Sequence, residues 1–293
     1  MIIYLAGGVT GNLIAEWKAY AELMKIYLAG LNGEKNRIGK ALLDENMKIF
    51  LAGNDGYRAD RFKVKDIYIL ESYFYIVDQP WMFPLIKRFK GFMLDSGAYT
   101  FMAAEEGAGH DIDWDKYVED YAAFVVEHDI DLYFELDIDS LVGIKEVERL
   151  RKKLELLTGR PCIPVWHKSR GKDYWHKMIR EYDYVAIGGI VVGEITSKEY
   201  PMFTYMLNEA RKENCKVHAL GFTNLEGLRK YKFYSVDSTA WLSGNRFGAV
   251  YYFDGKTMQK IKVPEGKRVK TKETALHNFN EWAKFSKYAE LNL

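Results

Sequence analysis

The chain has few cysteines, no long apolar run and almost no net charge, and each of these shortages excludes a class of protein. Its 293 residues include two cysteines, too few for a disulfide framework or a cysteine-rich zinc site. No window holds about 20 uninterrupted apolar residues, so no membrane span is expected. The first residues also lack the basic start of a signal peptide. We therefore expect a cytoplasmic protein with no membrane association.

The charge balance excludes only a general attraction to nucleic acid. Lysine and arginine number 42 against 41 aspartates and glutamates, a formal charge of +1. A local basic face would still be enough to bind phosphates. Apolar residues make up 48% and charged residues 28%, as in ordinary globular domains, so we expect an ordered chain. The composition leaves the oligomeric state open, and an oligomer is possible.

A short apolar motif ending in Ala-Gly recurs three times near the N-terminus. It occupies residues 3–7, 26–30 and 49–53, at a spacing of 23 residues. A strand followed by a short helix fits that spacing. Duplication and convergence on a good buried-strand sequence both explain the repeat, and the choice stays open.

Beyond the repeats, short strand-like runs alternate with helical patterns. The predicted strands are 67–70, 91–94, 132–136, 162–166, 184–187, 217–220 and 233–236. The predicted helices are 114–128, 142–157, 173–181, 200–214 and 224–231. This alternation indicates a parallel sheet with right-handed crossovers. We predict an α/β fold, a (β/α)8 TIM barrel forming a single domain over 1–293, with an open doubly wound sheet as the alternative.

Both ends of the chain are predicted to add to this barrel. Residues 1–47 form the N-terminal repeat region with βα additions. Residues 254–293 form a basic C-terminal extension, in which lysines and arginines crowd 254–272 before an amphipathic helix at 273–291. Such a charge run is usually a solvated face, but beside an active-site mouth it would hold phosphates.

Polar residues and glycines gather where the predicted strands end. These positions are Asp95, Asp137, Asp139, His167, Gly188, Gly189, Gly221 and Asp237. Barrel enzymes carry their chemistry at the carboxyl ends of the strands, so the pattern predicts a functional mouth there.

Two of the aspartates suit chemistry at the anomeric carbon of a sugar. With Asp95 and Asp237 facing each other, one carboxylate can stay ionised as a nucleophile while the other moves a proton. The simpler role for Asp95 is to cap the next helix. Gly188 and Gly189 would let backbone N–H groups approach a planar ligand, although a phosphate cradle or a plain turn looks the same. Glu194 would accept a hydrogen bond from a base edge rich in N–H groups.

These segments resemble the tRNA-guanine transglycosylase (queuine tRNA-ribosyltransferase) superfamily, whose members exchange a guanine in nucleic acid for a 7-deazaguanine. The Asp-Ser-Gly turn at 95–97 resembles that family's Asp-Ser-Gly-Gly motif, and Gly-Gly-Ile-Val-Val-Gly-Glu at 188–194 resembles its Gly-Gly-Leu-Ala-Val-Gly-Glu loop. Residues 220–228 echo the motif on the family's next strand, and Ser-Gly-Asn-Arg at 243–246 echoes its Ser-Gly-Arg. The resemblance runs from about residue 70 to 247.

The resemblance implies a role for each of the matching residues. Asp237 would be the nucleophile and Asp95 the general acid and base, while Tyr99 would stack on the base. Asp137 would accept from N1–H and the 2-amino group of a guanine-like base, and the 6-oxo group would accept from the amides of Gly188 and Gly189. Four cations lie just beyond strand ends, where each could contact a nucleic-acid phosphate or be a solvated surface charge: Lys168, Arg170, Lys172 and Arg246. This chemistry needs no cofactor and no metal.

The sequence also departs from the family pattern. The family's zinc-binding cysteines are absent, no RNA-binding module is appended, and His167 replaces a glutamine expected before the glycine loop. In the place of that glutamine, His167 would donate to the ring nitrogen or the 6-oxo group of the base. A histidine that only hydrogen-bonds a neighbour is the alternative. The compact size, the missing zinc ligands and the segment Ile-Leu-Glu-Ser-Tyr-Phe-Tyr at 69–75 look more like the phage and bacterial branch that modifies DNA. We therefore expect DNA, in preference to tRNA, and a free 7-deazaguanine base as the partners.

Three competing functions also fit parts of the sequence. A glycoside hydrolase would use the same barrel and carboxylate pair, but would not need the glycine loop or Asp137. A non-catalytic nucleic-acid-binding relative could dispense with Asp95 and Asp237. A phosphosugar-metabolising barrel would carry a glycine-rich phosphate site in its last two loops, which is not the pattern here.

Overall fold

The computed structural model describes residues 46–53, 66–98, 100, 112–242, 248–262 and 270–293. Within this part, eight short runs form a single parallel sheet. The strands are β1 (Lys48–Ala52), β2 (Tyr68–Ser72), β3 (Gly91–Asp95), β4 (Leu132–Tyr133), β5 (Val165–Trp166), β6 (Tyr184–Ile187), β7 (Lys216–Ala219) and β8 (Ser235–Ser238).

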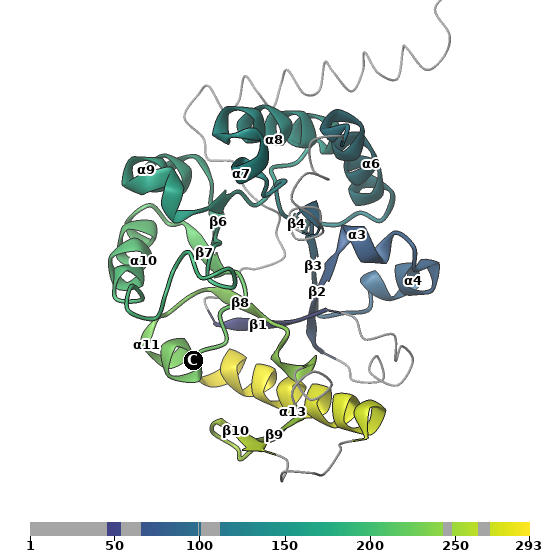
Figure 1. Ribbon diagram of the computed structural model, residues 1–293, viewed down its shortest axis with the longest axis vertical. Helices are drawn as coiled ribbons and strands as arrows, with labels where there is room; N and C mark the ends of the chain where they lie inside the picture. Colours follow the sequence, from purple (N-terminus) through teal and green to yellow (C-terminus); the bar gives the residue numbers. More distant parts are fainter. Residues whose placement is uncertain (1–45, 54–65, 99, 101–111, 243–247, 263–269) are drawn as a thin grey trace, which may run out of the picture.

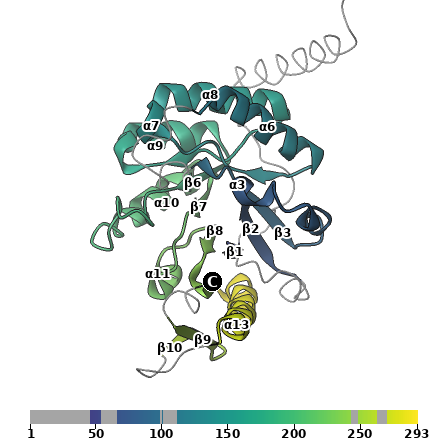
Figure 2. The same ribbon diagram turned by 45° about the vertical axis from the view of Figure 1, so that its right-hand side comes forward.

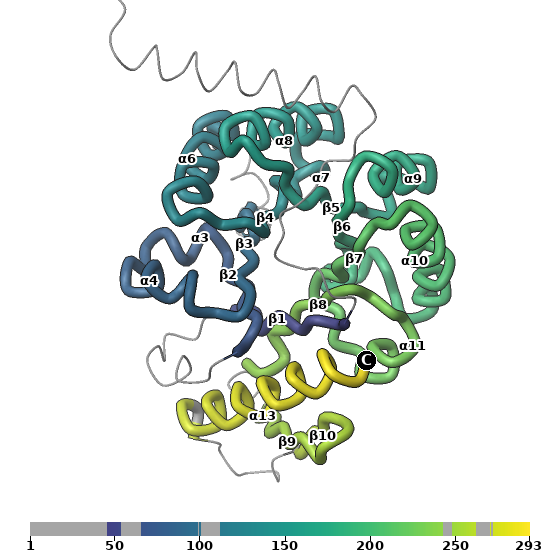
Figure 3. Tube along the Cα trace, turned by 180° about the vertical axis from the view of Figure 1, so that it is seen from behind, coloured from purple at the N-terminus to yellow at the C-terminus, as the bar shows by residue number. Residues whose placement is uncertain are grey.

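The sheet closes into a barrel. Its order is β4-β3-β2-β1-β8-β7-β6-β5, so β4 and β5 are the two edges. A parallel bridge between Phe134 and Ile163 joins these edges just beyond the strands. There, the Ile163 amide donates to the Tyr133 carbonyl at 2.8 Å, and the Glu135 amide donates to the Ile163 carbonyl at 3.1 Å. The ring of strands seen in Figures 1 and 3 confirms the predicted TIM barrel over the open sheet.

The N-terminal repeats contribute one strand to the described barrel. The third copy, at 49–53, overlaps β1, which pairs with β2 on one side and β8 on the other. The first two copies, at 3–7 and 26–30, lie outside the described residues. The predicted βα additions in 1–47 therefore stay a prediction.

Side chains alternate across the barrel wall because successive residues of a strand face opposite sides. On β1, Phe50 and Ala52 point inward, whereas Ile49 and Leu51 pack against the surrounding helices. The inner cluster contains Phe50, Ala52, Tyr68, Leu70, Met93, Leu132, Phe134, Ile163, Val165, Tyr184, Ala186 and Tyr234. These side chains fill the barrel interior, so we expect an open cavity only at its mouth.

The helices form a ring outside the strands (Figure 1). The longer ones agree with the predicted periodicity: α6 (Trp114–Glu127), α8 (Ile144–Thr158), α9 (Gly171–Glu181), α10 (Met202–Lys212) and α11 (Leu225–Lys230). The structure adds three helices of one turn: α3 (Tyr73–Ile76), α4 (Phe83–Ile86) and α7 (Asp139–Val142). One turn is too short to show a hydrophobic period, so the sequence did not predict these helices. None of the described helices is both long and apolar enough to cross a membrane.

The predicted C-terminal helix is present as α13 (Thr271–Asn292), and it packs against the outer side of β1. It lies between β1 and the antiparallel hairpin of β9 (Ala249–Phe253) and β10 (Met258–Lys262), as Figures 1 and 2 show. The hydroxyl of Ser286 donates to the Ile49 carbonyl at 2.9 Å, and Trp282 is buried. Of the basic run, Lys256 and Lys260 are exposed on the hairpin, and neither lines the mouth cavity. The described part of the run is therefore a solvated face.

A buried carboxylate completes the seam between β4 and β5. Glu135 is fully buried, and its Oε1 accepts from the Val165 amide at 2.8 Å, in place of a backbone carbonyl. Arg170 donates to the same oxygen at 2.8 Å, and Arg151 donates to Oε2 at 3.2 Å. The Arg170 and Arg151 side chains are 1% and 4% exposed, so the negative charge of Glu135 offsets two charges that water does not reach.

We predict that Glu135→Gln destabilises the protein strongly. The amide keeps an oxygen for Val165 but leaves two buried guanidinium groups short of their counter-charge, so the free energy of unfolding should fall by about 3–5 kcal/mol. Urea denaturation followed by circular dichroism measures this change. The matched control is Glu146→Gln, because Glu146 forms an exposed pair with Arg149 at 2.6 Å. Its loss should cost less than about 1 kcal/mol. Equal losses in the two variants would contradict the assignment of the seam.

Candidate functional site

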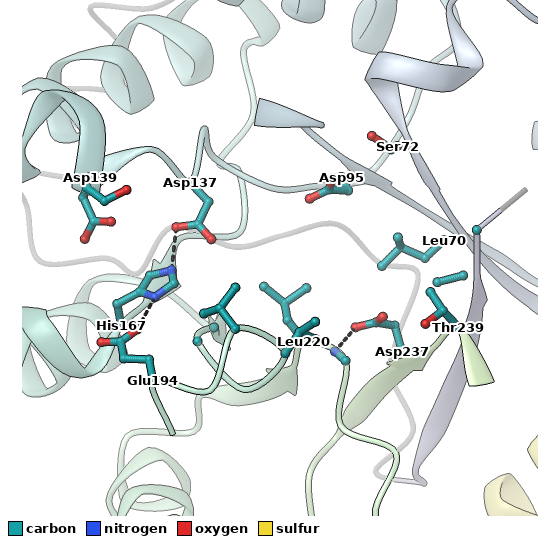
Figure 4. Close-up of a pocket in the computed structure, with 18 of the residues that line it drawn as sticks. Leu70, Ser72, Asp95, Asp137, Asp139, His167, Glu194, Leu220, Asp237 and Thr239 are labelled. Atoms are coloured by element: carbon teal, nitrogen blue, oxygen red, sulfur yellow. Dashed lines mark hydrogen bonds and ion pairs between the residues drawn. The ribbon is translucent and has the colours of Figure 1, made fainter. Parts of the chain in front are cut away.

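A cavity of about 1350 Å³ opens at the carboxyl ends of the strands. Each of the eight strands, or the residues directly after it, contributes to its lining. One such residue for each strand in chain order is Ala52, Ser72, Asp95, Asp137, His167, Gly188, Leu220 and Asp237. Figure 4 shows the three aspartates facing the same space. The topology thus brings together residues that are up to 185 positions apart in the sequence, from Ala52 to Asp237.

Asp95 lies at the end of β3 and carries a perturbed carboxyl group. Burial raises its pKa to about 6, and the nearby charges of Asp137 and Asp237 add to the shift. The Gly97 amide, which donates to Oδ2 at 2.9 Å, and the hydroxyl of Ser72 partly oppose it. Asp95 therefore exchanges its proton near neutral pH, which is the range a general acid and base needs.

Asp237 lies across the cavity from the Asp137 side, on β8, and only 7% of the residue is exposed. Its Oδ1 accepts from the Gly221 amide at 2.6 Å and faces Nε2 of His218 at 3.3 Å. Both partners belong to β7 or the turn after it. Among the described residues, no donor approaches Oδ2. Asp237 thus has one oxygen held by the protein and another that can reach a ligand.

On the opposite side of the mouth, His167 joins two acids. Its Nε2 lies 2.6 Å from Asp137 Oδ1, and its Nδ1 lies 2.8 Å from Glu194 Oε2 (Figure 4). Burial opposes a charge on the ring, but the hydrogen bonds and charges of these carboxylates outweigh it and raise the pKa of His167 to about 9. At neutral pH the ring is an imidazolium that donates to both acids. His167 therefore orients Asp137, whose Oδ2 has no partner within the described chain.

The glycine pair makes room for this histidine and its acids. A Cβ on Gly188 would lie 2.8 Å from the His167 ring, and a Cβ on Gly189 would collide with Glu194. Gly189 also has φ +78°, which favours glycine. The amide of Gly188 donates to the Trp166 carbonyl at 2.8 Å, so it is not available to a ligand. The expectation that both amides donate to a base therefore needs correction at Gly188, because the strand ladder has already used that donor.

Glu194 is also engaged by the protein. While Oε2 bonds His167, Oε1 accepts from the Ser169 amide at 2.9 Å. In this arrangement, Glu194 supports His167 more directly than it reads a base. Tyr99, predicted to stack on the base, lies outside the described residues.

The predicted phosphate contacts fall into different environments. The Arg170 side chain is 1% exposed and lines the cavity. Its Nε pairs with Asp139 at 2.9 Å and its Nη1 with Glu135 at 2.8 Å, whereas Nη2 has no hydrogen-bond partner in the described chain. Its contact with phosphate stays a prediction. Lys168 is half-exposed and pairs with Glu199. Lys172 is exposed, with its ammonium 4.6 Å from the ring centre of Tyr205. Arg246 lies outside the described chain.

Three of these residues have the composition of a metal site. Asp137, Asp139 and His167 each place one donor atom within 4.8 Å of the others. A metal requires an imidazole with a free nitrogen, whereas both nitrogens of His167 bond carboxylates, at 2.6 and 2.8 Å. Arg170 already neutralises Asp139. The donor set does not fit a resident cation, and we assign none to it.

Three residues that shape the site could not be given a role from the sequence. Glu135 was read as part of a strand, and its pairing with Arg151 and Arg170 could not be foreseen from spacing. His218 was likewise included in a predicted strand. The signal was there, since a histidine in an otherwise apolar strand must satisfy two ring nitrogens. Gly221 was recognised only as a glycine at a strand end, whereas in the structure its amide donates to Asp237.

We predict that Gly189→Ala releases His167, whereas Gly193→Ala does not. Both glycines have left-handed φ values, +78° and +79°, so both variants carry a similar backbone strain of about 1 kcal/mol. Only at Gly189 does the new methyl group collide with Glu194, while nothing lies within 4 Å at Gly193. The pKa of His167 should fall from about 9 toward its ordinary range in Gly189→Ala alone. NMR titration of the imidazole nitrogens measures it, and an identical pKa in both variants would contradict the assignment.

Comparisons with known proteins add little beyond this geometry. No family model matches the chain, and no curated protein matches it. Among solved structures, it is similar to a Coccidioides immitis protein provisionally assigned as a fructose-1,6-bisphosphate aldolase, with 12% identity, a TM-score of 0.49 and coverage of 93% of this chain and 94% of that one. It is also similar to the carboxyl transferase domain of Rhizobium etli pyruvate carboxylase, with 10% identity and a TM-score of 0.43 over 85% of this chain. This chain spans about half, 49%, of that second structure.

Proposed function

We propose that this protein is an enzyme, a nucleic-acid guanine transglycosylase that exchanges guanine for a 7-deazaguanine base, with DNA as the polymer. The observation that carries the proposal is the position of three aspartates around one cavity in different states. Asp95 has a pKa of about 6, Asp237 has one oxygen held by two partners, and Asp137 is oriented by a charged histidine. Base exchange needs an acid, a nucleophile and a base reader, and these three residues can supply them.

In the first half of the reaction, Asp237 takes the place of guanine on the sugar. A carboxylate oxygen of Asp237 attacks C1′ of the target nucleotide and forms an ester bond to the sugar. The bond between C1′ and the ring nitrogen of guanine breaks, and Asp95 donates its proton to the departing base. The bound base is thereby released as neutral guanine, and Asp95 becomes ionised.

The second half restores the enzyme. The incoming 7-deazaguanine loses the proton on its glycosylated nitrogen to Asp95 and attacks C1′, and the ester to Asp237 breaks. Two inversions at C1′ give retention of configuration. The target nucleotide has to leave its stack to reach the mouth, which costs a few kcal/mol.

Asp137 supports selection of a guanine-like base. A carboxylate accepts from both N1–H and the 2-amino group, whereas adenine offers an acceptor at N1 and no 2-amino group. His167 donates to Asp137 Oδ1, so Oδ2 is the oxygen that is available to the base. His167, in place of the family's glutamine, then has a clear role, because its imidazolium orients Asp137, the acid that reads the base.

We predict that Asp237→Asn abolishes base exchange, because the amide oxygen is too weak a nucleophile to displace guanine. The loss should exceed about 1000-fold, as for other nucleophile replacements. The assay is incorporation of radiolabelled guanine into duplex DNA, with tRNA in parallel. Asp173→Asn, an exposed aspartate on α9, is the control and should exchange normally. Wild-type protein that labels neither polymer would contradict the proposed function, and an active Asp237→Asn would contradict the nucleophile.

We also predict that exchange weakens as the pH rises above 6. Burial raises the pKa of Asp95 to about 6, so its acid form is complete well below that pH and is lost above it. The ratio kcat/KM for the nucleic acid should fall about tenfold per pH unit on this alkaline side. In Asp95→Asn, which cannot donate a proton, the residual rate should not follow this titration. A flat wild-type profile from pH 5 to 8 would assign the proton donor to another group.

A further inference from the structure

A line of polar groups runs into the barrel below Asp237. His218 on β7 is fully buried, and its Nδ1 lies 2.6 Å from Ser235 Oγ while its Nε2 faces Asp237 Oδ1 at 3.3 Å. Ser235 in turn bonds the hydroxyl of Tyr184 on β6. The register explains the line, since His218 pairs with Ser235 and residues two apart on β8 share the inner face.

These groups lie in an apolar interior. The ring of His218 packs against Phe50 and Phe134, with ring centres 6.1 and 5.4 Å away. Buried polar groups in such surroundings are expensive unless each finds a partner. Packing alone does not require a histidine at this position, because an aromatic ring without nitrogens would also fill the space. What distinguishes histidine from such a ring is its pair of hydrogen bonds, to Ser235 and Asp237.

The two groups at the ends of the line, Asp237 and Tyr184, determine the direction of its hydrogen bonds. An ionised Asp237 can only accept, so Nε2 of His218 carries the proton that faces it. In a neutral imidazole, Nδ1 is then the acceptor, and the Ser235 hydroxyl donates to it. Burial raises the pKa of the Tyr184 hydroxyl, which therefore keeps its proton and donates to Ser235. Every proton in the line has an acceptor, and no charge beyond that of Asp237 is needed.

We infer that His218 is a positioning residue that binds Asp237 Oδ1 through Nε2–H and leaves Oδ2 as the oxygen that attacks the sugar. The Gly221 amide holds the same Oδ1 at 2.6 Å, so two donors from the β7 side define the orientation of the carboxylate. The inference rests on the proposed base exchange for its catalytic meaning. The hydrogen-bond arrangement itself does not depend on the substrate.

This arrangement accounts for both states of Asp237. When Oδ2 forms the ester to C1′, Oδ1 becomes the ester carbonyl and can still accept from His218 and Gly221. No proton moves along the line during the step, because the proton given to the leaving base comes from Asp95. The line from Tyr184 to His218 therefore acts by holding one tautomer and one carboxylate rotamer.

The test combines exchange kinetics with two NMR measurements. His218→Phe keeps the packing against Phe50 and Phe134 but removes both nitrogens. We expect kcat for exchange of radiolabelled guanine to fall about 100-fold, the usual effect of misplacing a reacting group, with KM for the base unchanged. His218→Gln keeps a donor near the Nε2 position and should recover part of that loss. The ¹³C carboxylate signal of Asp237 at neutral pH should move in His218→Phe, because Oδ1 loses the donor that lies 3.3 Å away.

A second variant guards against misfolding of the first. Ser235→Ala is smaller and keeps the ring, but removes the donor that selects the tautomer, so kcat should fall about tenfold or less. In wild-type protein, ¹⁵N NMR of His218 should show the proton on Nε2. A spectrum with no proton on Nε2 would overturn the inference, as would an unchanged Asp237 carboxylate signal together with a kcat that stays within twofold of wild type in both variants. If wild-type protein labels neither DNA nor tRNA, the proposed function fails, and the two NMR measurements still decide the role of His218.

Discussion

The whole mouth depends on how the barrel closes between β4 and β5. These strands have two residues each, and the ladder between them is a single bridge, so backbone hydrogen bonds alone join the edges weakly. The carboxylate of Glu135 adds a partner for the Val165 amide, and two buried guanidinium groups hold that carboxylate in place. Asp137 lies two residues after Glu135, and His167 lies two residues after Val165. The seam therefore positions that half of the site.

The two halves of the mouth use charge differently. Around His167, acids and cations alternate in direct contact, so their charges are compensated and their side chains are held still. Around Asp95 and Asp237, no described cation lies in hydrogen-bond contact with either carboxylate, and the repulsion between them helps raise the pKa of Asp95. Two carboxyl groups driven to different protonation states can divide acid and nucleophile roles. A pocket of uniformly paired acids could not do this.

Much of the architecture could be predicted from the sequence, because its signals are local. The strand at 184–187 and the helix at 114–128 were found to within one residue, since alternation and helical periodicity depend on neighbours in the chain. The one-turn helices carry no such period. The short β4 and β5 were predicted as longer strands, because apolar side chains continue where the ladder does not. The strand ends, and with them the candidate aspartates, followed from the same reading.

What the sequence determined by itself is the set of groups at one end of the barrel, since residues that end parallel strands must meet there. Tertiary structure alone decided which of these groups remain available to a ligand. Arg170 follows a strand and carries a charge, yet Glu135 and Asp139 hold two of its nitrogens, and the amide of Gly188 is used within the sheet. His218 acquires its relation to Asp237 only through the register of β7 and β8. Hydrogen bonding between distant residues depends on ångström distances in space, and spacing along a chain carries no information about those distances.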